Sequence, residues 1–356
     1  MACTATDRSE SVEQETGVAI SSGGSTDAAP GTVGTDGAES SGFAAGSSED
    51  TGSLKLDVGA DDDPTTGPCV SGDCESTGCT AVDLLFVVDN SASMQPYQAA
   101  LAQAFPSFAQ AIVEGLAPGV NIHVGVTSTE MGYSSMGQNV IEYFNDQAVS
   151  CSATGDGDAP SASFYDTPDV APSNTNGAQG RLYTAAGRPY FDIDTDAGPE
   201  TVAELEAWFS AAAQIGEMGS QVEMSAAAAG WATDPANTPT NQGFLRDEGA
   251  VLVLFFVQDE HDQTPDDAAT TILQQIGAAK SACGGFDCVV GGGFVNEDCL
   301  SLTPLGQLFD AFGGDEVVTR TLPAPEAVTP QTFEDVLRDT LAQVIIDTCN
   351  EIEPPG

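Results

Sequence analysis

Three side chains that carry oxygen atoms alternate along one short turn of this sequence. Asp89, Ser91 and Ser93 follow directly after a run of apolar residues. Alternating Asp, Ser and Ser in a tight turn can direct three oxygen ligands at one point, and Mg²⁺, Mn²⁺ and Ca²⁺ prefer such ligands. The spacing therefore predicts a site for a divalent cation.

Helix capping is the simpler alternative for this turn. Ser91 or Ser93 could cap the helix that follows, with Pro96 in its first turn. Asp259 makes this alternative less attractive, because it follows a second buried strand. In open parallel sheets, ligands bind outside the carboxyl ends of the strands. Two acidic residues at two strand ends therefore favour a shared site.

Two apolar runs must position these acidic residues. Residues 81–89 and 250–257 are almost continuously apolar, which is typical of strands covered on both faces. A helix is predicted over 95–116, with apolar residues at helical spacing, and a strand over 120–127 follows it. Strand, helix and strand within this length form a βαβ unit.

The remaining patterns continue the alternation of strands and helices. Helices are predicted over 199–214, 220–231, 266–282, 305–312 and 329–347, and strands over 286–290 and 317–322. This order predicts an α/β fold, a doubly wound, mostly parallel central sheet flanked by helices, as in Rossmann-like domains.

Composition divides the chain into segments. Residues 1–78 are acidic and rich in Ser and Gly, and they carry too few large apolar side chains to offset the entropy of ordering, so we expect a disordered tether. The domain is expected over 79–350, followed by a tail over 351–356. Within it, 130–198 is rich in Gly, Ser, Asp and Pro and indicates a long surface insertion with at most one short hairpin.

The net charge excludes several classes of partner. The chain has 54 acidic and 8 basic residues, a formal net charge of −46. Nucleic acid is not expected as a partner, because phosphate binding needs clustered Lys and Arg, and an anionic membrane surface would repel the protein. Since acidic residues run along the whole chain, we expect a salt-tolerant extracellular surface.

The nine cysteines indicate an oxidising compartment. Cys3 follows Ala2 and precedes a polar stretch, which resembles the lipidated start of a mature bacterial lipoprotein, although a chance cysteine is the alternative. The other eight favour disulfides over zinc, because no Cys-x-x-Cys pair occurs and neither His lies near the first three of them. Pairing Cys79 with Cys349 would join the two ends of the domain, but the sequence leaves the connectivity open.

The Asp-x-Ser-x-Ser turn after an apolar strand resembles the metal-ion-dependent adhesion site of von Willebrand factor A domains. In that family a Thr from a later loop and an Asp after the fourth strand complete the site. Asp259 matches the Asp. Ser220 stands where the family has its Thr, in the segment that begins at Gly219, and Thr127 and Thr129 are fallback donors.

The resemblance covers about residues 80–350 and is greatest to the secreted bacterial lipoprotein-like branch, on Gly243–Arg246 and Asp259–Asp262. It implies an adhesion module, extracellular or displayed on the cell surface, with a lipid at Cys3 as its only link to an outer membrane. Such a module grips a protein partner's Asp or Glu carboxylate through Mg²⁺, Mn²⁺ or Ca²⁺ and is not an enzyme. The implied metal ligands are Asp89, Ser91, Ser93, Ser220 and Asp259.

The ligand chemistry is consistent with binding without reaction. Neutral hydroxyls leave the cation electrophilic, with an open coordination position for a partner. A metal-dependent hydrolase and a structural surface protein with a non-functional metal site remain alternatives. A phosphatase of the haloacid dehalogenase type would need a second Asp where Ser91 stands. Glu260, His261 and Asp262 are interpreted as solvated neighbours, and His123 as a structural histidine.

Overall fold

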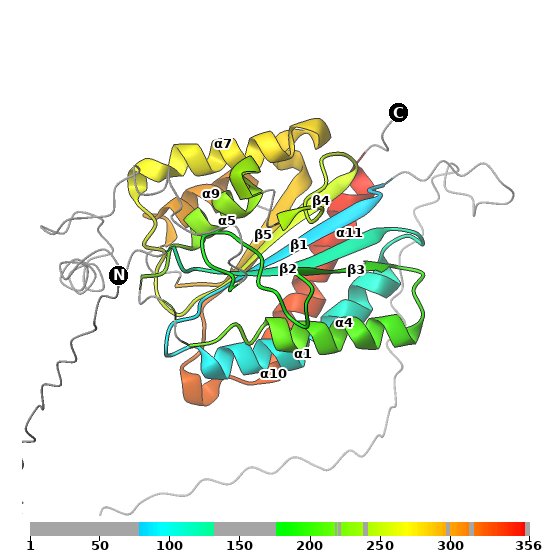
Figure 1. Ribbon diagram of the computed structural model, residues 1–356, viewed down its shortest axis with the longest axis horizontal. Coiled ribbons are helices and arrows are strands. Elements are labelled where there is room, and N and C mark those ends of the chain that lie inside the picture. The colour runs from blue at the N-terminus through cyan, green and yellow to red at the C-terminus, as the bar shows by residue number, and fades with distance from the viewer. Residues whose placement is uncertain are drawn as a thin grey trace, which may run out of the picture. The chain divides into compact units, whose positions relative to one another are not determined.

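Two apolar strands form the centre of the sheet (Figure 1). β1 (Ala81–Val88) and β4 (Ala250–Val257) pair in parallel along their whole length. Every residue of both strands is buried, as expected where helices cover both faces of a strand. The interpretation of these two runs as central strands is confirmed.

The computed structural model describes residues 78–131, 176–217, 219, 222–237, 241–296, 300–312 and 317–352. The expected tether up to residue 77, most of the expected insertion, and residues 353–356 lie outside this part of the chain.

Four further strands complete a six-stranded sheet with the order β3-β2-β1-β4-β5-β6. They are β2 (Asn121–Ser128), β3 (Tyr190–Asp194), β5 (Val289–Phe294) and β6 (Val317–Arg320). All neighbouring pairs are parallel except β2 with β3. The chain builds the sheet outward from β1 in both directions, so the doubly wound, mostly parallel α/β fold is confirmed.

The antiparallel strand β3 lies within residues 130–198, where the sequence indicated a surface insertion. Phe191 and Ile193 are buried, whereas Asp192 and Asp194 between and beside them are exposed. Five residues with alternate carboxylates give a weak apolar pattern, which sequence periodicity does not separate from a loop. The acidic outer face suits an edge strand, because charge discourages pairing with another chain.

Strand β5 begins and ends later than predicted, because glycines fill its second half. Gly291, Gly292 and Gly293 were excluded from the predicted strand over 286–290. In the structure, a Cβ atom on Gly292 would overlap the carbonyl oxygen of Val318 in β6. Glycine is therefore required for close approach of the two backbones, and it is not a break in the sheet.

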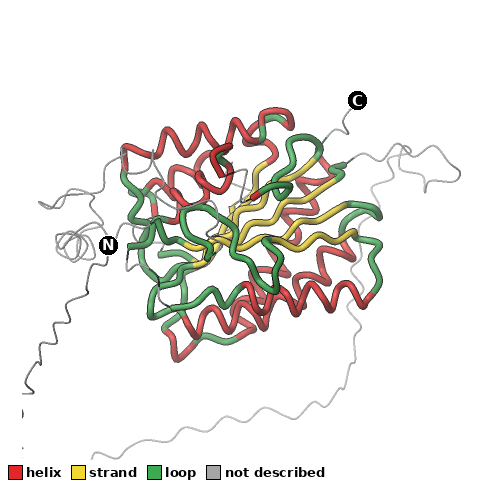
Figure 2. Tube along the Cα trace, in the orientation of Figure 1, coloured by secondary structure: helices red, strands yellow, loops and turns green. Residues whose placement is uncertain are grey.

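Helices cover both faces of the sheet (Figures 1 and 2). One face carries α1 (Gln95–Gly115), α4 (Pro199–Ala212), α10 (Pro330–Val336) and α11 (Ala342–Glu351), with a π-helical turn at Leu337–Leu341 between the last two. The other face carries α5 (Ser225–Thr233), α7 (Ala269–Ala279) and α9 (Pro304–Phe312). No helix in the described ranges is both long and apolar enough to cross a bilayer.

Alternate side chains of the central strands enter separate cores. Phe86 points into the core under α1, where its ring meets those of Phe105, Phe209 and Phe255. Its neighbour Leu85 belongs to the core under α5, α7 and α9. This alternation holds the carboxyl ends of β1 and β4 rigidly side by side.

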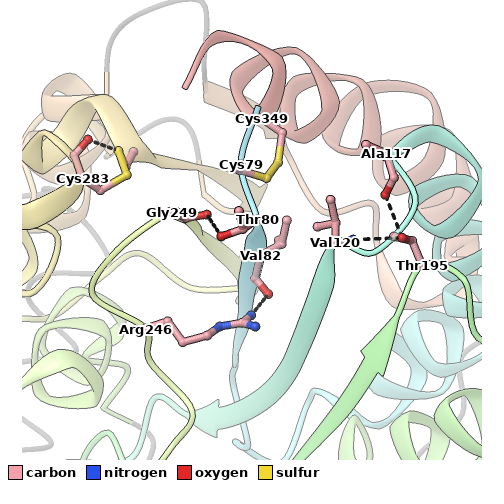
Figure 3. The surroundings of a disulfide bond; sticks show 11 residues. Cys79, Thr80, Val82, Ala117, Val120, Thr195, Arg246, Gly249, Cys283 and Cys349 are labelled. Atoms are coloured by element: carbon pink, nitrogen blue, oxygen red, sulfur yellow. Dashed lines mark hydrogen bonds between the residues drawn. A yellow bond between two sulfur atoms is a disulfide. The ribbon is translucent and has the colours of Figure 1, made fainter. Parts of the chain in front are cut away.

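A disulfide joins the two ends of the described domain (Figure 3). Cys79, just before β1, is bonded to Cys349 in α11, and the Cys79 backbone N–H donates to the Cys349 carbonyl at 2.7 Å. A second disulfide links Cys283 to Cys288 beside β5. The predicted pairing of the domain ends is thus present, whereas the remaining cysteines lie outside the described residues.

Candidate metal site at the carboxyl edge of the sheet

The two predicted acidic ligands lie at the same edge of the sheet. Asp89 directly follows β1, and its backbone N–H donates to the carbonyl of Val257, the last residue of β4, at 2.9 Å. Asp259 comes two residues after Val257. Because β1 and β4 are neighbours and run parallel, the two turns that leave them are adjacent.

The turn after β1 gathers the three predicted oxygen ligands. The Ser91 backbone N–H donates to Asp89 Oδ1 at 2.7 Å, and Ser91 Oγ lies 3.2 Å from Ser93 Oγ. Asp89 is fully buried, whereas Ser93 is exposed. Gln98 of α1 holds the turn from behind by donating to the Asp89 carbonyl at 2.9 Å. The turn is therefore held by hydrogen bonds, with the two serine hydroxyls facing each other.

The capping alternative for these serines is wrong. Helix α1 has Met94 at its N-cap position, and no side chain makes a cap hydrogen bond there. The hydroxyls of Ser91 and Ser93 face each other instead. Neither oxygen is committed to the helix, so both remain suited to a ligand.

Ser220 lies outside the described residues, but its neighbour Gly219 packs against the turn. The Gly219 backbone N–H donates to the Asn90 carbonyl at 2.9 Å. A Cβ atom at residue 219 would overlap the Asn90 side chain. The absence of a side chain at residue 219 lets the later loop approach the turn that carries Asp89 while the Asn90 side chain keeps its place.

The two fallback threonines have other roles. The Thr127 hydroxyl hydrogen-bonds to the carbonyls of Gly177 and Arg181, at 2.9 and 3.0 Å. The Thr129 hydroxyl donates to Glu223 Oε2 at 2.5 Å. Thr127 is therefore structural, and Thr129 positions a carboxylate.

Glu223 is a site residue that sequence reasoning missed. It is fully buried, and both its backbone N–H and its carbonyl bond to Gln263, at 2.7 and 2.6 Å. Its carboxylate lies against that of Asp89. A single Glu between a loop and a helix carries no sequence signal, because only the sheet topology brings residue 223 beside residue 89.

Three carboxylate oxygens at this edge are buried without a hydrogen-bond partner. They are Asp89 Oδ2, Glu223 Oε1 and Asp259 Oδ1. Burying an ionised carboxylate without a compensating partner is costly, and a cation relieves that cost. Together with the hydroxyls of Ser91 and Ser93, these atoms form a hard oxygen donor set that fits a divalent cation.

The carboxylates also raise one another's pKa. Burial, together with the neighbouring charges of Asp259 and Glu260, raises the pKa of Asp89 to about 7. Burial, followed by the charge of Asp89, places the pKa of Glu223 well above its usual range. In the described ranges, no three His, Cys, Asp or Glu side chains form a metal-binding group on their own. The candidate site instead combines carboxylates with serine hydroxyls.

Two of the three residues that follow Asp259 are buried, although the sequence predicted solvated neighbours. Glu260 is exposed, but His261 and Asp262 are buried. Asp262 accepts from the Thr264 hydroxyl at 2.7 Å and from the Leu305 backbone N–H at 3.0 Å. It thus ties the loop after β4 to α9, because a buried carboxylate must find donors.

His123 is a structural histidine, as predicted. It is buried in β2, and its Nδ1 lies 2.7 Å from the Phe244 carbonyl oxygen.

Replacement of Glu223 by Gln is expected to stabilise the metal-free protein by about 1–2 kcal/mol, because it removes a buried charge beside Asp89. Glutamine keeps an oxygen for the Thr129 hydroxyl. Thermal unfolding in EDTA should therefore show a higher Tm than for wild type. The exposed Glu248→Gln, outside the site, is the matched control, with a change below about 0.5 kcal/mol. If the Glu223→Gln variant unfolded in EDTA at a lower Tm than wild type, the inferred repulsion between Glu223 and Asp89 would be contradicted.

The comparisons with known proteins show a likeness only among solved structures. The chain matches no family model and no curated protein. Among solved structures it is similar to a protein described as von Willebrand factor type A from Catenulispora acidiphila, at 14% identity and a TM-score of 0.35. The match covers 75% of this chain and 43% of the other, so the chain spans less than half of that protein's length.

Proposed function

We propose that this chain carries a von Willebrand factor A-like binding module, which holds a partner through a divalent cation at the carboxyl edge of its sheet. The three unpartnered carboxylate oxygens beside the paired serines carry this proposal. The proposed ligands are Asp89, Ser91, Ser93, Ser220 and Asp259, with Glu223 added from the structure. Mg²⁺, Mn²⁺ and Ca²⁺ suit such oxygen atoms.

The arrangement supports recognition without a chemical reaction. The bound cation would supply an electrophilic position to which a partner's oxygen atom binds. The chain's own residues fix that position, since Gln98 and Gly219 hold the turn and Thr129 holds Glu223. Ser93 and Glu260 are exposed at the rim, where a large partner has access. The family resemblance points to an Asp or Glu side chain as the partner's group.

An extracellular or cell-surface location is part of the proposal. Disulfides persist in oxidising compartments, and the chain has two among its described residues. A net charge of −46 keeps the protein soluble and away from anionic surfaces. Attachment to an outer membrane would then depend on a lipid at Cys3.

Metal-dependent stabilisation tests the proposed site. At a metal concentration about 100 times Kd, Mg²⁺, Mn²⁺ or Ca²⁺ should raise the Tm of wild type by about 5–10 °C over its value in EDTA. Asp89→Ala should lose this rise, because it removes the ligand at the centre of the turn. The exposed Asp310→Ala in α9 should keep it, which controls for cations bound loosely by the acidic surface. An equal rise in Asp89→Ala and wild type would refute the site.

A further inference from the structure

We infer that Gln98 is a positioning residue, whose side-chain amide fixes the spacing between the turn after β1 and the loop after α4. Gln98 is not a proposed ligand, yet the affinity of the site for a cation depends on it. This inference rests on the proposed function and adds a residue that acts from behind the site. It follows from hydrogen bonds that join two segments far apart in the sequence.

The Gln98 side chain is buried in α1 and uses both ends of its amide. The residue is 3% exposed. Its Nε2 group donates to the Asp89 carbonyl at 2.9 Å and to the Gly216 carbonyl at 2.8 Å, which its two hydrogens allow at once. Its Oε1 accepts from the Gly216 backbone N–H at 3.3 Å. The bonds to Gly216 span 118 positions of the chain, so the amide joins two separate segments.

The loop after α4 meets the turn at two points. Gly216 has a φ of +111°, a backbone conformation that residues with a side chain rarely adopt. In this conformation both its N–H and its carbonyl reach the Gln98 amide. Further along the same loop, the Gly219 N–H donates to the Asn90 carbonyl at 2.9 Å. Of the two contacts, only the one at Gly216 depends on a side chain, so the length of that side chain sets the spacing there.

This spacing matters because a cation site tolerates little displacement of its ligands. Metal–ligand distances in proteins vary by only about 0.2 Å. Asp89 begins the turn that carries Ser91 and Ser93, and Gln98 holds its carbonyl. Without the amide, the Asp89 carbonyl loses that hydrogen bond and the loop at Gly216 is no longer held against the turn. Loss of partners that orient metal ligands typically lowers metal affinity about 10- to 100-fold.

Isothermal titration of the full chain with Mn²⁺ alone tests the inference, at a temperature at which every variant is folded by circular dichroism. Gln98→Met keeps the length of the side chain and removes all three hydrogen bonds. We expect it to weaken Mn²⁺ binding by about 10-fold or more. Gln103→Met is the matched control, because Gln103 is exposed in the same helix and donates only to the Ala99 carbonyl. Its Kd should stay within about 2-fold of wild type.

Gly216→Ala tests the same contact from the loop. Gly216 is exposed and no atom lies within 4 Å of an added Cβ, so the variant strains the backbone without crowding the core. It should also weaken Mn²⁺ binding. In the double variant with Gln98→Met, the loss of affinity should be smaller than the product of the two single losses, because both variants break one contact.

The outcomes separate this inference from the proposed function. Equal Mn²⁺ binding by wild type and Asp89→Ala would overturn the metal site itself. Binding that Asp89→Ala abolishes but Gln98→Met leaves unchanged would overturn only the positioning role, even if Gln98→Met had a lower Tm in EDTA. If Gln98→Met did not fold, unchanged Mn²⁺ affinity in Gly216→Ala would overturn that role. Single losses that multiply in the double variant would overturn the shared contact.

Discussion

Replacement of Arg246 by Met is expected to lower the free energy of unfolding by about 3–5 kcal/mol, because it removes the guanidinium that is hydrogen-bonded to a buried carboxylate. Asp83 is fully buried in β1. The backbone N–H and the Nε–H of Arg246 donate to the two carboxylate oxygens of Asp83, each at 2.7 Å. The guanidinium also donates to the Val82 carbonyl at 2.7 Å (Figure 3). Removal of the side chain therefore takes from Asp83 its directly hydrogen-bonded cation, and leaves His123 Nδ1 at 3.6 Å and the charge of Lys280.

Urea unfolding measures this effect, with Arg320→Met as the control. Arg320 is exposed and donates only to the adjacent Thr319 carbonyl, so its loss should cost less than about 1 kcal/mol. The double variant of Arg246→Met with Asp83→Asn should recover part of the loss, since no ionised carboxylate then stays behind. Equal costs for the two arginines would show that Asp83 is not dependent on Arg246.

Removal of the Cys79–Cys349 disulfide, by Ala at both positions, is expected to cost about 2–5 kcal/mol. The bond joins residues separated by 270 positions, so it restricts the unfolded chain strongly. The Cys283–Cys288 bond closes a separation of only 5 and should contribute less. It therefore serves as the matched control for the loss of any disulfide.

Thermal unfolding of both double variants, with and without reductant, checks this prediction. Reductant should lower the Tm of wild type and leave the Cys79→Ala/Cys349→Ala protein almost unchanged. The metal-dependent rise in Tm should survive in that variant, because Cys79 precedes β1 whereas Asp89 follows it. A Tm that does not differ from wild type would show that the bond adds no stability.

The central strands and the turn after β1 were predictable because their signals are local. An apolar run such as Ala81–Val88 can be buried on both faces only inside a parallel sheet, so its composition alone indicates its place. Asp89, Ser91 and Ser93 are close in the chain, and a tight turn must bring them together. Asp259 was predictable by the same logic, from the end of a second such run.

Residues joined by long-range contacts were not predictable. Glu223 enters the site because the loop before α5 crosses the edge between β1 and β2, where Thr129 and Gln263 hold it. Asp262 is buried because α9 offers it the Leu305 N–H. The sequence near each residue carries no pattern that marks it as a site residue: Glu223 is a lone carboxylate before an alanine-rich helix, and Asp262 stands in an acidic loop.

The amino-acid sequence by itself determined the fold class, the central strands and the first turn of the candidate site, since apolar periodicity and ligand spacing act over a few residues. Only the tertiary structure decided which carboxylates share the carboxyl edge, and so how negative the site is. The reason is that burial and electrostatic repulsion depend on distances across strands, and sequence separation does not set those distances.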